Sequence, residues 1–394
     1  MCGVLVASLA WAEPEWRASV GIGEEYNDNT NERRHGEGDF VTTLEPAVGY
    51  RHEGVRTLLE GEYRGTWNHY ADNTRDQEFN HDARAHALFE AWRNFLYFDL
   101  SDTYRLVNLD TTRGEVVEDD SSLDQVQRNT FSFSTFITPR LGERGQLKTG
   151  YAYNNIWYEK RGESKNIHAG FADLTYELSD RMELLSGYGY TLQLAGSGDL
   201  DRHVAYLGLG FQFAANSVVF VKAGPRFTHY HESGASSTKL FWDAGWTHDF
   251  GRLLLEARSG LDAEDDPDSG DTYDKRYGTI RLTKEFDRSS VGVFATLEDY
   301  DQEDSDSIRR TYAGLTLGHD LTPRLKGVAS IARDLRTEDS DDRVRWYGSV
   351  VFRYALAEDL AAEAWYRHKD VLNSEDDDDD YAVHRIGVRL TKQF

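Results

Sequence analysis

Apolar and polar side chains alternate along most of the chain beyond residue 13. In the segment 344–354, Trp346 and Val350 share one parity, whereas Arg345 and Arg353 share the other. A period of two is typical of a β-strand with one apolar and one polar face. The same alternation recurs in the segments 59–68, 147–154 and 240–247. The pattern therefore predicts an all-β chain.

The alternating segments are joined by two kinds of connection in turn. Tight turns are expected near residues 52–54, 93–94, 139, 179–180, 216, 251, 287, 323 and 358, and longer polar loops lie between them. About 20 strands fit the length at roughly 19 residues per strand with its connection, although about 18 or 16 would also be possible. Short turns at one end and long loops at the other are typical of an antiparallel up-and-down transmembrane β-barrel.

Hydropathy favours the same fold. The mean hydropathy is −0.65, and no apolar run after residue 12 reaches the ~18 residues that a membrane helix needs. This excludes a helical membrane protein but not a barrel, in which only alternate residues face lipid. Strands of about ten residues or more match a tilted crossing of the bilayer. The alternative is a soluble β protein.

The two ends of the chain carry further signals. Residues 1–12 are apolar and end in Ala10-Trp11-Ala12, an A-x-A pattern, so we expect a secretory signal at 1–12 and the barrel at 13–394. The last strand, 381–394, alternates and ends in Phe394. It resembles the C-terminal signal by which bacterial outer-membrane barrels are recognised by the barrel-assembly machinery. Its alternative is the edge strand of a soluble domain.

Charge limits the partners. The chain has 69 acidic and 44 basic residues, a formal net charge of −25. This balance argues against nucleic acid, which needs a basic patch, and leaves outer-membrane lipid and lipopolysaccharide as the expected surroundings. Acidic residues gather in the long loops, which we expect to be solvated; Ca²⁺ or Mg²⁺ binding there is the alternative. We expect no metal site and no cofactor.

The polar strand faces would line the lumen. The candidate pore-lining residues are Arg64, Arg84, Glu90, Glu256, Arg345, Arg353, Glu363, Arg367, Arg385 and Arg389. Arginines concentrate in the last three strands, and these adjoin the first strands when a barrel closes. One wall could therefore be basic and suit anionic solutes. Equally, facing carboxylates could balance these charges, and the lumen could be hydrated without conducting.

The connection 108–125 is the longest in this interpretation. Its candidate constriction residues are Arg113, Glu118, Asp119 and Asp120. Loops of this length usually have a role. We expect it either to fold into the lumen, opposite basic residues such as Arg345, Arg353, Arg367 and Arg389, or to stand outside as a solvated flap.

Catalysis finds little support in the sequence. The chain has 13 histidines, but none belongs to a G-x-S-x-G, H-E-x-x-H or P-loop pattern. His168, His203 and His368 lie singly on alternating segments. We therefore expect the protein not to be an enzyme, with a barrel enzyme as the least favoured alternative.

The first hairpin carries a family resemblance. The segment 23–29 (GEEYNDN), followed by 39–42 (DFVT), Pro46 and Gly49-Tyr50, resembles the opening of the β-barrel porins associated with exosortase (PEP-CTERM) and exopolysaccharide loci. The resemblance implies an outer-membrane porin or export conduit for small solutes or a polysaccharide. A non-conducting surface barrel with acidic outer loops is the alternative.

Overall fold

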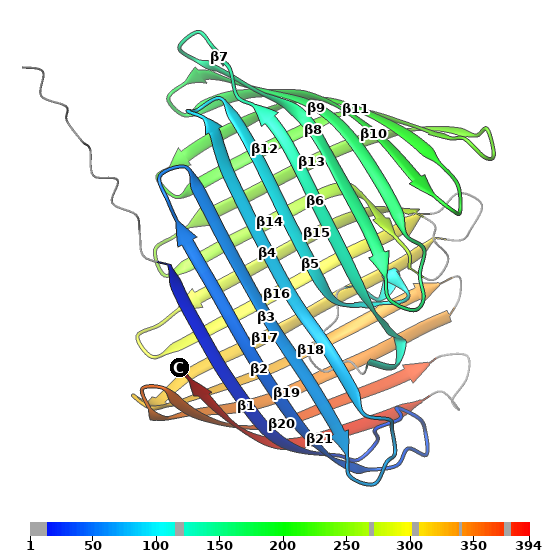
Figure 1. Cartoon of the computed structure of the whole chain (residues 1–394), viewed down its shortest axis with the longest axis vertical. Helices are drawn as coiled ribbons and strands as arrows, with labels where there is room; N and C mark the ends of the chain where they lie inside the picture. The colour runs from blue at the N-terminus through cyan, green and yellow to red at the C-terminus, as the bar shows by residue number, and fades with distance from the viewer. Residues whose placement is uncertain (1–13, 115–121, 268–271, 302–306, 339–340, 374–379) are drawn as a thin grey trace, which may run out of the picture.

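A computed structural model describes residues 14–114, 122–267, 272–301, 307–338, 341–373 and 380–394. They form twenty long strands, one two-residue strand and two short 3₁₀ helices (Figure 1). In chain order these are β1 (Glu15–Asn27), β2 (Asp39–Glu53), β3 (Thr57–Tyr70), β4 (Glu78–Trp92), β5 (Leu96–Asn108), η1 (Thr111–Arg113), η2 (Ser122–Asp124), β6 (Gln125–Ile137), β7 (Arg140–Leu141), β8 (Gly145–Tyr158), β9 (Lys165–Ser179), β10 (Met182–Ala195), β11 (Leu200–Ala214), β12 (Ser217–Tyr230), β13 (Ser236–Asp249), β14 (Leu253–Asp265), β15 (Thr272–Glu285), β16 (Ser289–Asp301), β17 (Ile308–Thr322), β18 (Leu325–Glu338), β19 (Asp341–Ala357), β20 (Leu360–Asn373) and β21 (Tyr381–Gln393).

Each long strand pairs antiparallel with the next, and β21 pairs with β1 from Ser19–Gln393 to Asn27–Arg385. The sheet is therefore a closed barrel of twenty strands, as the alternation predicted. The closing seam reaches the last residue, because the Phe394 amide donates to the Ala18 carbonyl at 2.9 Å. Closure leaves no sheet edge, so the backbone N–H and C=O groups of each strand find hydrogen-bond partners on both sides.

The two ends of the barrel differ. Tight turns such as those at Asn94 and Gly251 join the strands at one end, and their positive φ angles of 52° and 89° suit Asn and Gly. The longer connections lie at the other end, hereafter the outer end, as in outer-membrane barrels. The Lys392 ammonium of β21 donates a hydrogen bond to the Asp359 carboxylate, which ties the β19–β20 turn to the closing strand. The same bond lowers the pKa of Asp359.

Proline interrupts pairing without breaking the barrel. Pro46 pairs with Val20 of β1, but on its other side the β2–β3 register passes from Leu44–Trp67 directly to Ala47–Arg64. Proline has no N–H to donate, so one ladder loses a bond while the neighbouring ladder continues. The pairing of β2 with β3 is thus interrupted at Pro46.

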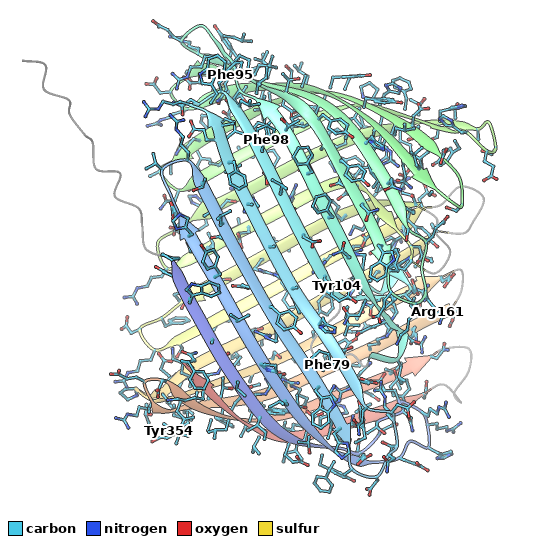
Figure 2. The ribbon with its side chains drawn as sticks, viewed as in Figure 1. Phe79, Phe95, Phe98, Tyr104, Arg161 and Tyr354 are labelled. Carbon is cyan, nitrogen blue, oxygen red and sulfur yellow. The ribbon has the colours of Figure 1, made fainter. Side chains whose placement is uncertain are left out.

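Large apolar side chains cover the outer face of the barrel. Leu207, Leu240 and Ile386 are exposed, as are Val, Ile, Leu and aromatic residues of the same parity on neighbouring strands. Figure 2 shows Phe79, Phe98 and Tyr104 on the outside of the wall. Such a continuous apolar surface is stable only against lipid. Among the described residues, no helix is long and apolar enough to cross a membrane.

A belt of tyrosine–histidine pairs marks one height on this outer face. In the described strands, a tyrosine hydroxyl bonds a histidine Nδ1 across four strand pairs at 2.7–3.0 Å. The pairs are Tyr63–His81, Tyr151–His168, Tyr188–His203 and Tyr366–His384. Each histidine lies three residues inside the outer end of its strand. Amphipathic rings at one level are the expected residues of a lipid–water boundary.

Candidate functional site: the lumen and its outer mouth

The polar strand faces line the lumen. Cross-strand partners point to the same side, so the registers Arg353–Glu363 and Glu363–Arg389 place these three residues together on the inner face. The same parity holds for all the candidate pore-lining residues: Arg64, Arg84, Glu90, Glu256, Arg345, Arg353, Glu363, Arg367, Arg385 and Arg389. Glu90 lies at the tight-turn end of β4, where its carboxylate accepts from the Asn94 amide.

Carboxylates balance most of the predicted basic wall. Arg389 lies 3.1 Å from Glu45, Arg345 lies 3.5 Å from Asp334 and Arg353 lies 2.5 Å from Glu363. Arg367 stacks over the Trp365 ring at 5.3 Å. The last three strands therefore do not present a row of unpaired arginines. The wall is not a basic surface; most of its arginines are balanced by facing carboxylates.

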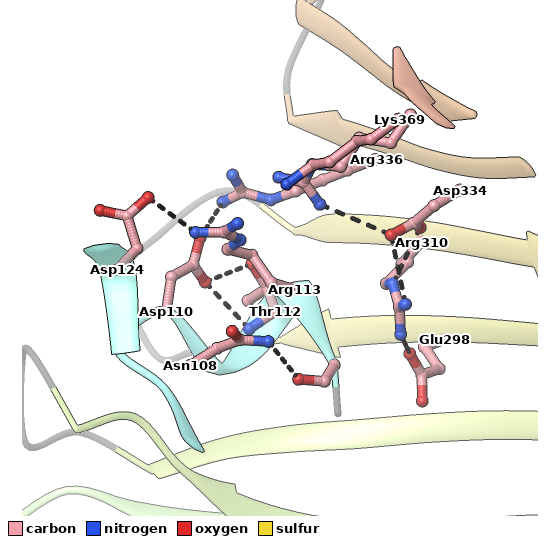
Figure 3. Close-up of polar contacts among 12 residues, drawn as sticks. Asn108, Asp110, Thr112, Arg113, Asp124, Glu298, Arg310, Asp334, Arg336 and Lys369 are labelled. Carbon is pink, nitrogen blue, oxygen red and sulfur yellow. Dashed lines mark hydrogen bonds and ion pairs between the residues drawn. The ribbon is translucent and has the colours of Figure 1, made fainter. Parts of the chain in front are cut away.

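The β5–β6 connection crosses the lumen. Its Thr111 amide donates to the Asp266 carboxylate at 3.1 Å, and its Asp110 carboxylate lies 3.3 Å from Arg336 of β18. In the strand order, β17 and β18 lie on the wall opposite β5 and β6. Figure 3 shows the connection against these strands. The described part is therefore folded inward; Glu118, Asp119 and Asp120 lie outside the described residues.

Local contacts fix the shape of this connection. Asp110 caps η1 by accepting from the Thr112 amide at 2.9 Å, and Arg113 pairs with Asp124 at 2.8 Å. The Asn108 side chain donates to the Gly114 carbonyl at 2.9 Å. Thr112 is fully buried. The connection thus enters the lumen as a folded element held by its own hydrogen bonds and ion pair (Figure 3).

The wall that meets the connection is not the one expected. Arg310 and Arg336, on β17 and β18, contact it, whereas the residues expected from the sequence were Arg345, Arg353, Arg367 and Arg389. These four residues lie on β19–β21, next to β1, and Arg367 and Arg389 line the cavity beside the connection. The acidic residues 118–120 that they were expected to face lie outside the described residues. Arg353 also lies near the tight-turn end of β19.

Arg310 is held in a buried charge network. Its guanidinium lies 2.9 Å from Glu298 and 2.9 Å from Asp334, and Gly114 packs directly against it. A buried arginine needs such partners, because an unpaired charge away from water is very costly. No pattern in the sequence indicates this cluster, because its members come from three strands.

A second connection also bends inward. Glu32, between β1 and β2, lies 3.1 Å from Lys369 and 3.3 Å from Arg385. Its carboxylate also accepts from the Tyr381 hydroxyl at 3.0 Å. Glu32 has a positive φ of 49°, and its backbone turns its side chain over β20 and β21. This anchor was missed, because nothing near Glu32 in the sequence distinguishes it from other loop carboxylates.

Burial changes along the barrel axis. Near the outer end, the side chains of Arg310 and Lys369 are 7% and 2% exposed. Near the tight turns, those of Lys326 and Arg353 are 66% and 68% exposed. The lumen is therefore packed at its outer mouth and open to water towards the tight-turn end.

A polar cavity of about 560 Å³ lies beside the inward connection. Thr111 and Gly114 form part of its lining, together with inward residues of β1–β6, β14, β20 and β21. The volume is in the range of small-molecule sites. Its walls are charged rather than apolar, which suits a hydrophilic solute.

The described residues contain no group of three or more His, Cys, Asp or Glu that could hold a metal ion. The acidic runs at 268–271, 302–306, 339–340 and 374–379 lie outside them. His168 and His203 belong to the outer-face belt, and His368 stacks on His384 with ring centroids 4.6 Å apart on the same face. These three histidines therefore do not face the cavity.

No family model and no curated protein matches the chain. Among solved structures, it is similar to a mutant ferric enterobactin receptor from Pseudomonas aeruginosa, with a TM-score of 0.53 and 8% identity over 97% of this chain and 81% of that chain. A second mutant of that receptor, in complex with enterobactin, gives a TM-score of 0.54 and 8% identity over 97% and 82%. A loop-deleted OmpT, an outer membrane protein of Vibrio cholerae, gives 0.42 and 10% identity over 97% and 99%.

The likeness to the two receptor structures shows the fold. The closed barrel, its apolar outer face and its boundary belt of aromatic rings together place the protein in the bacterial outer membrane.

Proposed function

We propose that the protein is an outer-membrane channel for small polar solutes, with the β5–β6 connection setting the width of its mouth. One observation carries the proposal. The connection spans the lumen to Arg336 on the opposite wall, while the lumen towards the tight turns is lined by exposed charged side chains. Barrels of about this strand number enclose a space wide enough for water unless it is filled.

Export of a polysaccharide is a more specific form of this proposal. The resemblance of the first hairpin to exosortase-associated porins supports it, and so does the polar lining of the cavity. In that hairpin, the Asn29 amide donates to the Asn27 side chain at 3.0 Å, which is an Asx turn that starts the inward-bent connection.

A non-conducting barrel is the second candidate. The ion pairs of Arg336 with Asp110 and of Lys369 with Glu32 at the mouth favour it, because they tie the two connections to the wall. In that case the acidic outer loops would meet a partner and the lumen would carry no current.

Planar-bilayer conductance distinguishes these functions. Arg336→Gln removes the ion pair to Asp110 and should widen the mouth, so we expect a higher single-channel conductance than in the wild type. Arg252→Gln is the control, because Arg252 pairs with Asp287 in an exposed tight turn at the other end. No current from any of the folded proteins would refute the channel and support the non-conducting barrel.

Ion preference tests the constriction separately. Neutralising Glu118, Asp119 and Asp120 with Gln or Asn should lower cation preference, most clearly at low salt, where screening is weak. An unchanged reversal potential at low ionic strength would remove these three residues from the constriction.

A further inference from the structure

Three arginines on one side of the barrel face the cavity without an ion pair to a carboxylate. Arg64 lies on β3, Arg105 on β5 and Arg128 on β6, and all three line the cavity. Within the described part of the chain, none of the three side chains makes an ion pair or a hydrogen bond. The paired arginines 310, 345, 385 and 389 show that the same lumen supplies partners elsewhere.

The register makes this arrangement unfavourable when the cavity is empty. Arg105 and Arg128 are direct cross-strand partners, so two like charges point into the lumen about 5 Å apart at their Cβ atoms. Arg64 is the direct partner of Asp82 on β4. That carboxylate is instead approached by Arg84 at 3.7 Å.

The other acids of the lining are already engaged. Glu45 pairs with Arg389, Glu78 with Arg75 and Glu264 with Lys275. Glu25 accepts from the Trp365 indole at 2.7 Å. The cavity therefore has positive charge to spare, although the whole chain has a net charge of −25.

We propose that this arginine row is a binding site for a small solute that carries two or more oxyanion groups, such as carboxylates or phosphates. Guanidinium groups bind these oxyanions through paired hydrogen bonds. Arg105 and Arg128 hold one oxyanion between them. Arg64, two strands away and so about 10 Å along the sheet, takes a second. This inference rests on the proposed channel for its physiological meaning, but not for the binding itself.

Binding of citrate to the folded, detergent-solubilised protein tests the site. Isothermal titration calorimetry at low salt should show citrate binding to the wild type. Arg105→Gln combined with Arg128→Gln should weaken that binding at least tenfold. Added KCl should also weaken it, because the attraction is between charges. Glucose, which is neutral, should not bind at this site.

The control is charge-matched. Arg258→Gln combined with Arg281→Gln removes two positive charges from β14 and β15, and neither residue lines the cavity. This variant should bind citrate as the wild type does. Heat-modifiability on gels checks that each variant is folded.

The outcomes separate this site from the channel. Citrate binding that depends on Arg105 and Arg128 supports the site even if no current is seen, which would refute only the channel. Equal affinity in the wild type and the arginine variant, or no binding to the wild type, would overturn the site whatever the conductance. Inorganic phosphate that binds as tightly as citrate would refute the two-group ligand.

Discussion

Gly114 is one of the points where the inward connection touches the opposite wall. A Cβ built on it would lie 1.9 Å from Nη1 of Arg310 and 2.6 Å from Cζ. Its φ is 74° and its ψ is −159°, a region that is essentially restricted to glycine. Gly114→Ala therefore imposes backbone strain and also displaces a guanidinium.

If the connection stays in the lumen, the free-energy cost of Gly114→Ala has two parts. The backbone strain is about 1–3 kcal/mol. Moving Arg310 would weaken one of its charge-assisted bonds to Glu298 or Asp334, at about 1.5–3 kcal/mol. Among the described residues, lifting the connection instead breaks the Asp110–Arg336 pair and the Thr111–Asp266 bond. We expect the connection to leave the lumen while the barrel stays folded.

Two assays detect this movement. Single-channel conductance should rise, and trypsin should cut the intact barrel after Arg113 faster, because that bond then reaches solvent. Gly142→Ala is the matched control: Gly142 has a φ of 72°, but no atom lies within 4 Å of its built Cβ. If Gly114→Ala matches the wild type in both assays, the connection does not close the mouth as described.

Three further outcomes are expected. Glu32→Gln should destabilise the barrel by about 3–5 kcal/mol in urea unfolding, because Lys369 would keep a buried charge with its main partner gone; a loss within about 0.5 kcal/mol would contradict this anchor. Deleting Phe394, whose amide bonds to β1, should impair assembly far more than neutralising Asp376–Asp379, and equal yields of heat-modifiable barrel would count against it. Arg128→Gln should stabilise the empty barrel by about 0.2–1 kcal/mol by removing the repulsion from its cross-strand arginine; a clear loss of stability would show that the arginine row has a structural partner.

The sequence determined the wall of this barrel. Trp346 and Arg345 alternate because each residue of a strand points to the side opposite its neighbour, and this rule needs no knowledge of the rest of the fold. Turn residues such as Asn94 and Gly251 likewise act locally through their own backbone angles. Strand number, the lumenal side of most candidate residues and the membrane location could all be predicted on this basis.

Only the tertiary structure decided what each lumenal residue meets. The parity of Arg345 predicts that it faces the lumen. Parity does not predict that Arg345 pairs with Asp334, or that Arg105 lies opposite another arginine, Arg128. Closure of the sheet sets which strands stand opposite one another. It therefore brings Asp110 to Arg336 and Glu32 to Lys369 over most of the chain length. Contacts across a lumen depend on this closure and on strand register. The two-residue alternation of the sequence predicts neither of them.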